Sequence, residues 1–293
     1  MRITKEQEKI LNALTCERLR DDEINIDLIQ NFENKKGELI VDYLKKNGKQ
    51  EDKNGTTAFY VVKTKSGDVL MFFSLKCGEL FEPFDEEEIK SDYQERLILL
   101  QAILNSEAEP EEKQSALEQL LSKSIDKGIP AIQVLSKLIK EQKAQNEIIG
   151  LLNDDDETEQ NVNVARVSRT YPGIELVHFC TNDKAKKIWE SYNINRPMGE
   201  VIFWRFIAPK FYAVQDIVGC EYAFLFAADL SEDRTLINYY NVALKFEVDV
   251  EVGTTKPLYD LACVFMCQRL ESMRINRDRY FENFNPDEMD VQI

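Results

Sequence analysis

The chain has 293 residues, of which 43% are hydrophobic and 31% charged, a composition typical of a folded protein with one large domain or two smaller ones. It contains no run of about 18 apolar residues, so we expect no membrane span. Its formal net charge is −16, which argues against nucleic acid as an unaided partner because binding to the phosphate backbone needs clustered cations.

The first residues predict a helix rather than a secretory signal, because an apolar core and a small-residue cleavage site are missing. The helix is expected over residues 4–20, with Thr4 as N-cap and Gln7 closing a capping box. Six cysteines are scattered through apolar sequence, and Cys263 and Cys267 have no histidine near them. We expect reduced, buried thiols in a cytoplasmic protein, with neither disulfides nor a metal site.

A second amphipathic helix is predicted for the stretch GELIVDYLKK, with Leu39, Tyr43 and Leu44 on one side. The stretches TTAFYVVKTK and VLMFFSLKCGELF follow, and both are rich in β-branched and aromatic residues. The SGD turn between them predicts a hairpin. Because both strands are apolar on both faces, we expect them in the covered centre of a sheet.

The character of the sequence changes at Glu82. Residues 82–160 contain 20 acidic and 8 basic side chains, so this segment carries −12 of the net charge. Three helical segments follow one another there, and the charged stretch NDDDETEQN closes them as a linker. The pattern predicts a helical insertion at residues 83–160, which separates residues 1–82 and 161–293 as two halves of one α/β domain.

The α/β pattern resumes with the strand GIELVHFCTND, in which Ile174, Leu176, His178 and Cys180 are expected to share one face. After a short helix, the stretch MGEVIFWRFIAPKFYAVQDIVG predicts a buried helix that Pro209 must kink or interrupt. A strand (CEYAFLFAAD), a helix (SEDRTLINYYNVALKF) and a last strand (YDLACVFMCQRL) complete the chain.

The turn before the buried helix carries the first functional signal, and it reads Arg196-Pro197-Met198-Gly199-Glu200-Val201. This turn and the order of elements around it resemble the GCN5-related N-acetyltransferase (GNAT) family of acyl-CoA-dependent acyltransferases. In that family a turn of pattern Gln/Arg-x-x-Gly-x-Gly/Ala begins a helix, and its backbone N–H groups hold the coenzyme A pyrophosphate. Val201 replaces the small residue of the pattern, and Glu200 adds a negative charge.

Two further stretches carry the resemblance. Asp233 lies seven residues before Tyr240, which Tyr239 precedes, as in the family's helix after the next strand. The predicted hairpin is similar to the strand pair of the toxin-like branch. The resemblance covers residues 22–82 and about 161–270. It implies an α/β fold with a mixed, mostly antiparallel central sheet flanked by helices, here with an inserted all-α subdomain.

The resemblance implies an N-acyltransferase that moves acetyl from acetyl-CoA to an amine by direct attack. Tyr240 would protonate the leaving thiolate, a role for which Tyr239 competes, and Glu175 or a water would be the base. His178, the only histidine, is predicted to be a core residue rather than a base, because apolar neighbours flank it in the strand. The cofactor-binding residues implied by the resemblance are Val177, His178, Phe179, Cys180, Arg196, Met198, Gly199, Glu200, Val201 and Asp233.

The acidic charge predicts a small amine or a Lys-bearing protein as acceptor. Residues 83–160 are predicted either to form part of the acceptor site or to bind a second copy of the chain or a protein partner. An alternative is a GNAT-fold binding module that engages a protein through this insertion. Glu200 and Val201 favour the module, whereas Arg196, Gly199 and Tyr240 favour the enzyme.

Overall fold

The computed structural model describes residues 3–82, 99, 102–103, 106–126, 169–229, 231–248, 252–255 and 263–281. The chain divides into two compact units, one formed by Met1–Pro83 with Arg169–Ile293 and the other by Phe84–Ser168. In the second unit the described helix is α6 (Pro110–Asp126), and the other predicted helical segments and the linker lie mostly outside the described residues. No helix in the described part of the chain is long and apolar enough to cross a membrane.

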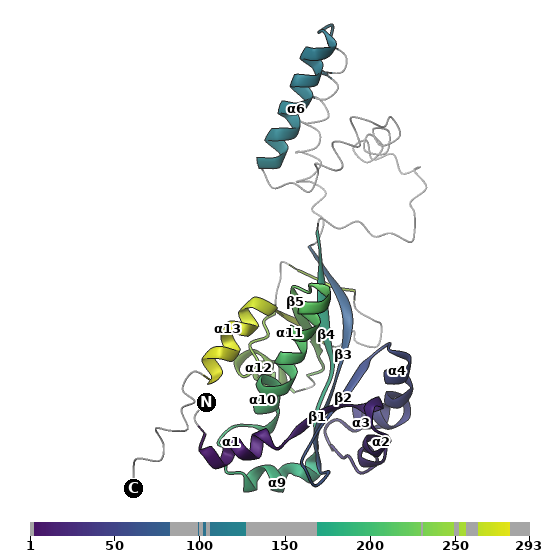
Figure 1. Cartoon of the computed structure of the whole chain (residues 1–293), viewed down its shortest axis with the longest axis vertical. Helices are drawn as coiled ribbons and strands as arrows, with labels where there is room; N and C mark the ends of the chain where they lie inside the picture. The colour runs from purple at the N-terminus through teal and green to yellow at the C-terminus, as the bar shows by residue number, and fades with distance from the viewer. Residues whose placement is uncertain are drawn as a thin grey trace. The chain divides into compact units, whose positions relative to one another are not determined.

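The larger unit is built on a six-stranded sheet in which the strands follow their order in the chain. Neighbouring strands are antiparallel, except that β4 and β5 are parallel. The predicted mixed, mostly antiparallel sheet is therefore confirmed (Figure 1). The strands are β1 (Thr15–Arg18), β2 (Ala58–Lys63), β3 (Val69–Glu82), β4 (Arg169–Thr181), β5 (Tyr222–Ala227) and β6 (Val264–Arg269).

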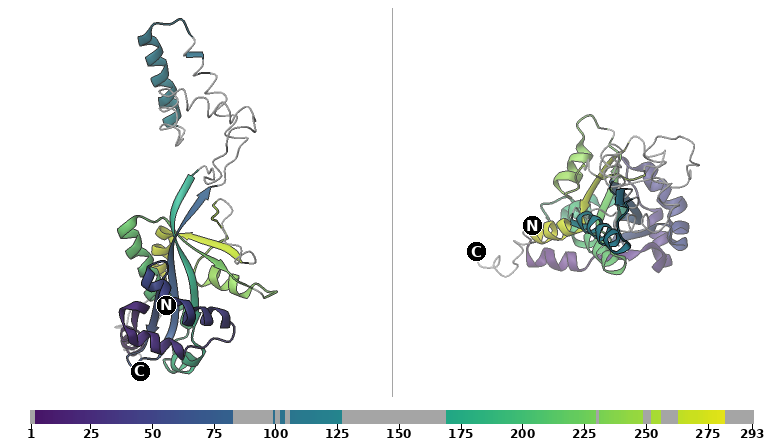
Figure 2. Two further views of the ribbon diagram at one scale, coloured as in Figure 1. Left: turned by 90° about the vertical axis from the view of Figure 1, so that its right-hand side faces the viewer. Right: turned by 90° about the horizontal axis from the view of Figure 1, so that it is seen from above.

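Helices cover both faces of the sheet, as Figure 1 and Figure 2 show. One apolar core joins the sheet to α1, α10, α11, α12 and α13, and a second core joins the other face to α2 and α3. The α-helices described in this unit are α1 (Lys5–Asn12), α2 (Glu23–Gln30), α3 (Glu38–Tyr43), α4 (Lys49–Asn54), α9 (Lys186–Ser191), α10 (Met198–Ile202), α11 (Ala208–Val218), α12 (Thr235–Val242) and α13 (Leu270–Phe281).

The first helix is shorter than its sequence predicts. The capping box is present, since the Gln7 backbone N–H donates to Thr4 Oγ1 and the Thr4 N–H donates to Gln7 Oε1. However, α1 ends at Asn12, so the prediction of helix over residues 4–20 is wrong beyond that point. Residues from Thr15 form the edge strand β1, whose backbone pairs with β2 instead of continuing the helix. The long-range pairing overrides the local helical pattern.

The second predicted helix is present but buries a different face. A helical run from α3 through the π-turn η2 (Leu44–Gly48) to α4 packs Val41 and Leu44 against the sheet. Leu39 is 85% exposed and Tyr43 is 39% exposed, so the predicted Leu39–Tyr43–Leu44 face is wrong. The predicted face and the buried face both have residues at helical spacing. The face that is buried is the one that also brings Gly48 against Leu19 and Phe59.

The predicted hairpin of β2 and β3 is confirmed, and it lies in the middle of the sheet. Gly67 in its turn has φ +90°, a left-handed conformation that a residue with a Cβ rarely adopts. Beside the hairpin, the fully buried carboxylate of Asp52 accepts hydrogen bonds from Arg18 Nε at 2.9 Å and from the Phe59 N–H at 3.0 Å. This carboxylate fixes α4 against both β1 and β2.

A β-bulge in β4 changes which residues face each core. Ser74 pairs with His178 and Leu75 pairs with Leu176, so Val177 is an extra residue in β4. Ile174 and Leu176 belong to the core under α10 and α11, whereas Cys180 belongs to the core under α2 and α3. The prediction that Ile174, Leu176, His178 and Cys180 share one face is therefore wrong, because the bulge reverses the alternation of side chains.

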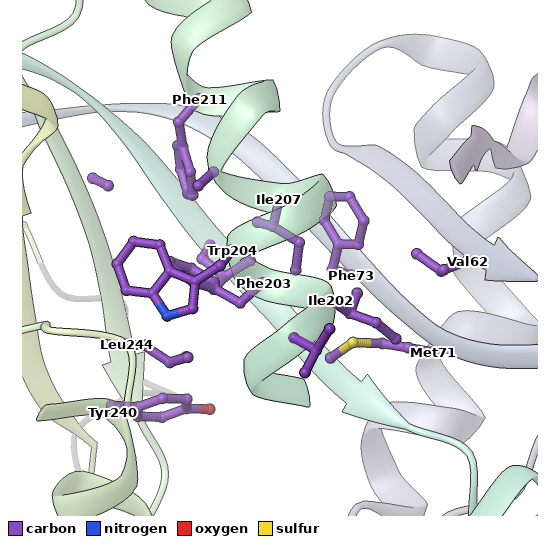
Figure 3. Close-up of a cluster of buried hydrophobic side chains, with 14 of the residues drawn as sticks. Val62, Met71, Phe73, Ile202, Phe203, Trp204, Ile207, Phe211, Tyr240 and Leu244 are labelled. Atoms are coloured by element: carbon purple, nitrogen blue, oxygen red, sulfur yellow. The ribbon is translucent and has the colours of Figure 1, made fainter. Parts of the chain in front are cut away.

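The buried helix after the turn runs through α10, the π-turn η4 (Phe203–Ile207) and α11. Pro209 is near the start of α11, directly after the π-turn, so the predicted interruption is confirmed. Figure 3 shows Phe203, Trp204 and Ile207 of this run packed into the core beside Phe73. The predicted elements β5, α12 and β6 are present, and α13 follows them without a sequence prediction.

Candidate functional site

A cleft opens where β4 and β5 separate. The two strands pair in parallel only from Gly173–Tyr222 to Glu175–Phe224, just before the bulge at Val177. Beyond Glu175 no residue of β5 pairs with β4, and residues 175–181 line a cleft of about 1440 Å³. The backbone of β4 after the bulge is thus bonded to β3 on one side and borders the cleft on the other.

The cleft gathers most of the predicted site residues. Opposite β4 it is lined by the end of β5, by α12 and by the start of α10, and a further wall comes from the segment between Asn34 and Thr57. The predicted residues that line it are Glu175, Val177, His178, Phe179, Cys180, Met198, Gly199 and Tyr240. The predicted residues that do not line it are Arg196, Glu200, Val201 and Asp233.

The start of α10 faces the cleft through Met198 and Gly199. The first N–H of this helix to bond to a preceding carbonyl is that of Val201, which donates to Pro197 O at 3.2 Å. A Cβ on Gly199 would lie 2.9 Å from the Tyr239 hydroxyl and 3.2 Å from the Phe179 ring. A larger residue here would displace the Tyr239 hydroxyl and press on the Phe179 ring, so the packing of these two rings favours glycine.

Glu200 and Val201 point away from the cleft. Val201 is fully buried in the core of α10 and α11, so its side chain does not narrow the cleft. Glu200 is also buried, its carboxylate lies 3.5 Å from Arg196 Nη1, and it accepts a hydrogen bond from Tyr280. Burial, followed by the Glu200 charge, raises the pKa of Tyr280. The negative charge of the turn is thus directed toward α13 and partly neutralised by Arg196.

Tyr240 is buried among apolar groups and lines the cleft. Its ring meets the ring of Phe179 edge-on, with centroids 6.1 Å apart, and Figure 3 shows its hydroxyl directed toward helix α10. Burial raises the pKa of Tyr240 well above the ordinary value for a phenol, and it does the same for Tyr239. Both phenols therefore hold their protons at neutral pH.

Asp229, rather than Asp233, is the acidic residue that bonds to the first turn of α12. Its carboxylate accepts hydrogen bonds from the Leu236 N–H at 2.8 Å and the Ile237 N–H at 3.0 Å, and it lines the cleft. The hydrogen bond from Ser231, supported by these backbone donors, lowers the pKa of Asp229 to about 2. Asp229 was not among the predicted site residues, although an aspartate that can bond to the backbone two residues further on is a turn signal.

His178 is partly buried on the other wall of the cleft. Its Nδ1 lies 2.7 Å from Ser74 Oγ, and its ring stacks between Tyr43 and Phe59 with centroid distances of 5.3 Å and 5.4 Å. Burial lowers the pKa of His178 to about 4, although the charge of Glu51 opposes this shift. The imidazole is therefore neutral at physiological pH, as expected of a core histidine, but it also lines the cleft.

The described part of the chain contains no group of three or more side chains that could hold a metal ion. None of the six cysteines, all of which lie in the described residues, forms a disulfide, and Cys180, Cys220 and Cys267 are buried as predicted. Cys77 is exposed, so the prediction of buried thiols is wrong for this residue. Successive side chains of a strand point to opposite faces, and at this position of β3 the side chain faces solvent.

No protein-family model and no curated protein matches the chain. Among solved structures it is similar to AtaTR bound with AcCoA, with 13% identity, a TM-score of 0.45, and coverage of 90% of this chain and 98% of that chain. It is also similar to a mutant of KacT, with 12% identity, a TM-score of 0.44 and coverage of 90% and 99%. AtaT complexed with acetyl-methionyl-tRNAfMet gives 13% identity, a TM-score of 0.39 and coverage of 90% and 98%.

Proposed function

We propose that the protein is an acyl-CoA-dependent N-acyltransferase that moves acetyl from acetyl-CoA to an amine by direct attack. The cleft between β4 and β5 carries this proposal, because it brings a free strand edge, a helix start and a protonated phenol to one place. The mixed, mostly antiparallel sheet flanked by helices is also what the resemblance to the GNAT family implies.

The residues around the cleft fit an acyl-CoA. The backbone of Val177 to Cys180 would hydrogen-bond the amide groups of the pantetheine, as a neighbouring strand would. The first N–H groups of α10, at Met198 and Gly199, would face the pyrophosphate with the positive end of a helical run that extends to Val218. When bound, acetyl-CoA supplies the acetyl group as an activated thioester.

Tyr240 would give its proton to the departing sulfur. Its hydroxyl has a raised pKa and lies in an apolar surrounding, so the phenol is present as a donor throughout the neutral range. On the opposite side of β4, Glu175 lines the cleft and pairs in register with Lys76. Glu175, through a water, would take the proton released by the amine.

The acceptor would be a small amine or a lysine side chain of a protein. The chain's net charge of −16 attracts cations, and residues 82–160 concentrate most of that charge. We propose residues 83–160 as the part that engages such a protein or a second copy of the chain. The free cysteines fit a reducing, cytoplasmic compartment.

Binding of acetyl-CoA tests the proposal. At 100 times its dissociation constant, the ligand should stabilise the folded protein by ~2.7 kcal/mol, measured as a rise in Tm. Release of free thiol in the presence of a panel of amines would then measure transfer. A folded protein whose Tm does not change at millimolar acetyl-CoA, and which carries no coenzyme A when purified, would exclude this function.

Tyr240→Phe separates the chemical role of this residue from its packing, because the substitution removes only the hydroxyl. Turnover should fall by about 100-fold or more, with little change in the Kd of acetyl-CoA. Tyr239→Phe is the matched control, since Tyr239 is adjacent and its hydroxyl packs over Gly199. If Tyr239→Phe is instead the slow variant, the proton donor is Tyr239.

One observation favours the alternative of a binding module. Arg196, the cation of the turn, does not line the cleft and lies beside Glu200. A module of this kind would fold normally and bind a protein through residues 83–160, but it would not bind coenzyme A. The binding experiment above therefore also decides between the two functions.

A further inference from the structure

Two loops meet beside the carboxyl end of β4. The Asp183 N–H donates to Glu33 O at 2.7 Å, and the Lys35 N–H donates to Asp183 Oδ2 at 2.8 Å. The Asn34 side-chain amide donates to Thr181 O at 2.8 Å. These bonds hold the loop at residues 33–37 against the loop that leads from β4 into α9. The two loops are therefore joined by one backbone hydrogen bond and by two hydrogen bonds between a side chain and the backbone.

The joined loops are rich in lysine although the protein is acidic. With the first two residues of α9 included, they carry Lys35, Lys36, Lys184, Lys186 and Lys187. Lys184 is paired with Glu33 at 2.6 Å, and Lys186 is paired with Asp183 at 2.7 Å. Lys36 has no ion-pair partner among the residues that the structure describes. Of the five lysines, Lys36 and Lys186 line the cleft, and Glu190 is the acidic side chain of α9 that lines it with them.

The same loops lie near the start of α10. Gly37 packs against Cys180, since a Cβ at that glycine would lie 3.5 Å from the Cys180 sulfur. The preceding residue of β4, Phe179, contacts Gly199 of α10. The lysine-bearing loops and the start of α10 therefore border the same end of β4, where the phosphate groups of an acyl-CoA would lie.

We propose that Lys36 and Lys186 bind the phosphate groups of the acyl donor in place of Arg196. This inference rests on the proposed function. Each ammonium group supplies a positive charge and three hydrogen-bond donors to a phosphate. Arg196 does not line the cleft, whereas Lys36 and Lys186 line it from two separate elements. The positive charge expected from the turn is thus supplied by Lys36, in the loop at residues 33–37, and by Lys186, at the start of α9.

Calorimetric titration of the full chain with coenzyme A tests this assignment. Lys36→Gln and Lys186→Gln should each weaken binding by about 10-fold, because each removes a charge-assisted contact with phosphate. Arg196→Gln should leave the Kd nearly unchanged. The matched control is Lys187→Gln, since Lys187 is exposed, adjacent to Lys186 and outside the cleft lining.

Two shortened ligands identify the group that is bound. Pantetheine lacks all the phosphates, so its binding at millimolar concentration should be equal in wild type and in every variant. With 3′-dephospho-CoA, loss of the lysine effect would assign the lysines to the 3′-phosphate, and retention would assign them to the pyrophosphate. Wild-type affinity for coenzyme A in both lysine variants, or a strong loss in Arg196→Gln alone, would overturn the assignment. Absence of coenzyme A binding in the wild type would instead overturn the proposed function.

Discussion

The His178 imidazole is neutral, and protonating it at this buried position would lower the stability of the folded protein. Its pKa is lowered by burial from 6.5 to about 4, so the unfolded chain takes up a proton in this range and the folded chain does not. Stability is therefore fully present above pH 6.5 and is lost as the pH falls toward 4. The loss is at most about 3 kcal/mol, and less to the extent that solvent in the cleft reaches the ring.

Urea unfolding at several pH values measures this effect. Between pH 6.5 and 5, where few carboxylates titrate, the wild type should lose stability with a slope that His178→Asn lacks. Asparagine does not titrate in this range and can still bond to Ser74, whose side chain is fully buried. Parallel slopes for the two proteins would mean that the imidazole is protonated in the folded state as readily as in the unfolded chain.

The docking of α4 depends on one buried carboxylate. Asp52 accepts hydrogen bonds from Arg18 Nε, the Arg20 N–H and the Phe59 N–H, and its side chain is 0% exposed. Asp52→Ala should destabilise the fold by about 3–5 kcal/mol, because it leaves buried donors and a partly buried guanidinium without their acceptor.

The matched control for this variant is Asp42→Ala. Asp42 lies on the neighbouring helix α3 and pairs with Lys46 at 3.5 Å, but its side chain is 54% exposed. Its loss should cost about 1 kcal/mol or less, since exposed ion pairs contribute little. Equal urea midpoints for the two variants would show that Asp52 does not anchor the helix.

Elements with strong local patterns could be predicted from the sequence, and elements chosen by distant contacts could not. The β2–β3 hairpin follows from its apolar strands and from Gly67, and the buried helix at 198–218 follows from its long apolar run. In contrast, β1 is only four residues long and is specified by pairing with β2, more than 40 residues away.

The candidate site also divides into residues that could be predicted from local sequence patterns and residues that depend on distant contacts. The turn at Gly199 and the tyrosine at 240 could be found through their resemblance to the motifs of the GNAT family, and both line the cleft. The bulge at Val177 depends on the register between β3 and β4, which no local pattern records. Asp229 was missed because its role as a cap depends on where β5 ends, and the lysine-bearing loops were missed because only the folded chain joins them.

At the scale of the whole molecule, the strands that flank the second unit are paired to their ends. Phe81 pairs with Thr170 and Glu82 pairs with Arg169, so the larger unit closes on itself at this point. Replacing residues 84–168 with a short Gly/Ser linker should therefore leave a folded protein that binds coenzyme A. Circular dichroism and calorimetric titration would check this.

The same shortened variant assigns the role of the second unit. Loss of amine transfer with coenzyme A binding intact would place the acceptor site partly in residues 84–168. A change confined to the oligomeric mass would make this unit an assembly element. A variant that fails to fold would show that the larger unit needs it, against the division into two compact units.

The pairing of β3 with β4 across residues 83–168 also constrains how the chain is made. Closing a loop of this length costs ~3 kcal/mol more entropy than closing a tight hairpin, and β4 leaves the ribosome only after the whole intervening segment. Until then β3 presents a long unpaired edge that contains Val69–Leu75, a run that is buried in the finished sheet. Such an edge is a template for pairing with other chains. The nascent protein is therefore most prone to aggregation in the interval between synthesis of Glu82 and synthesis of Thr181.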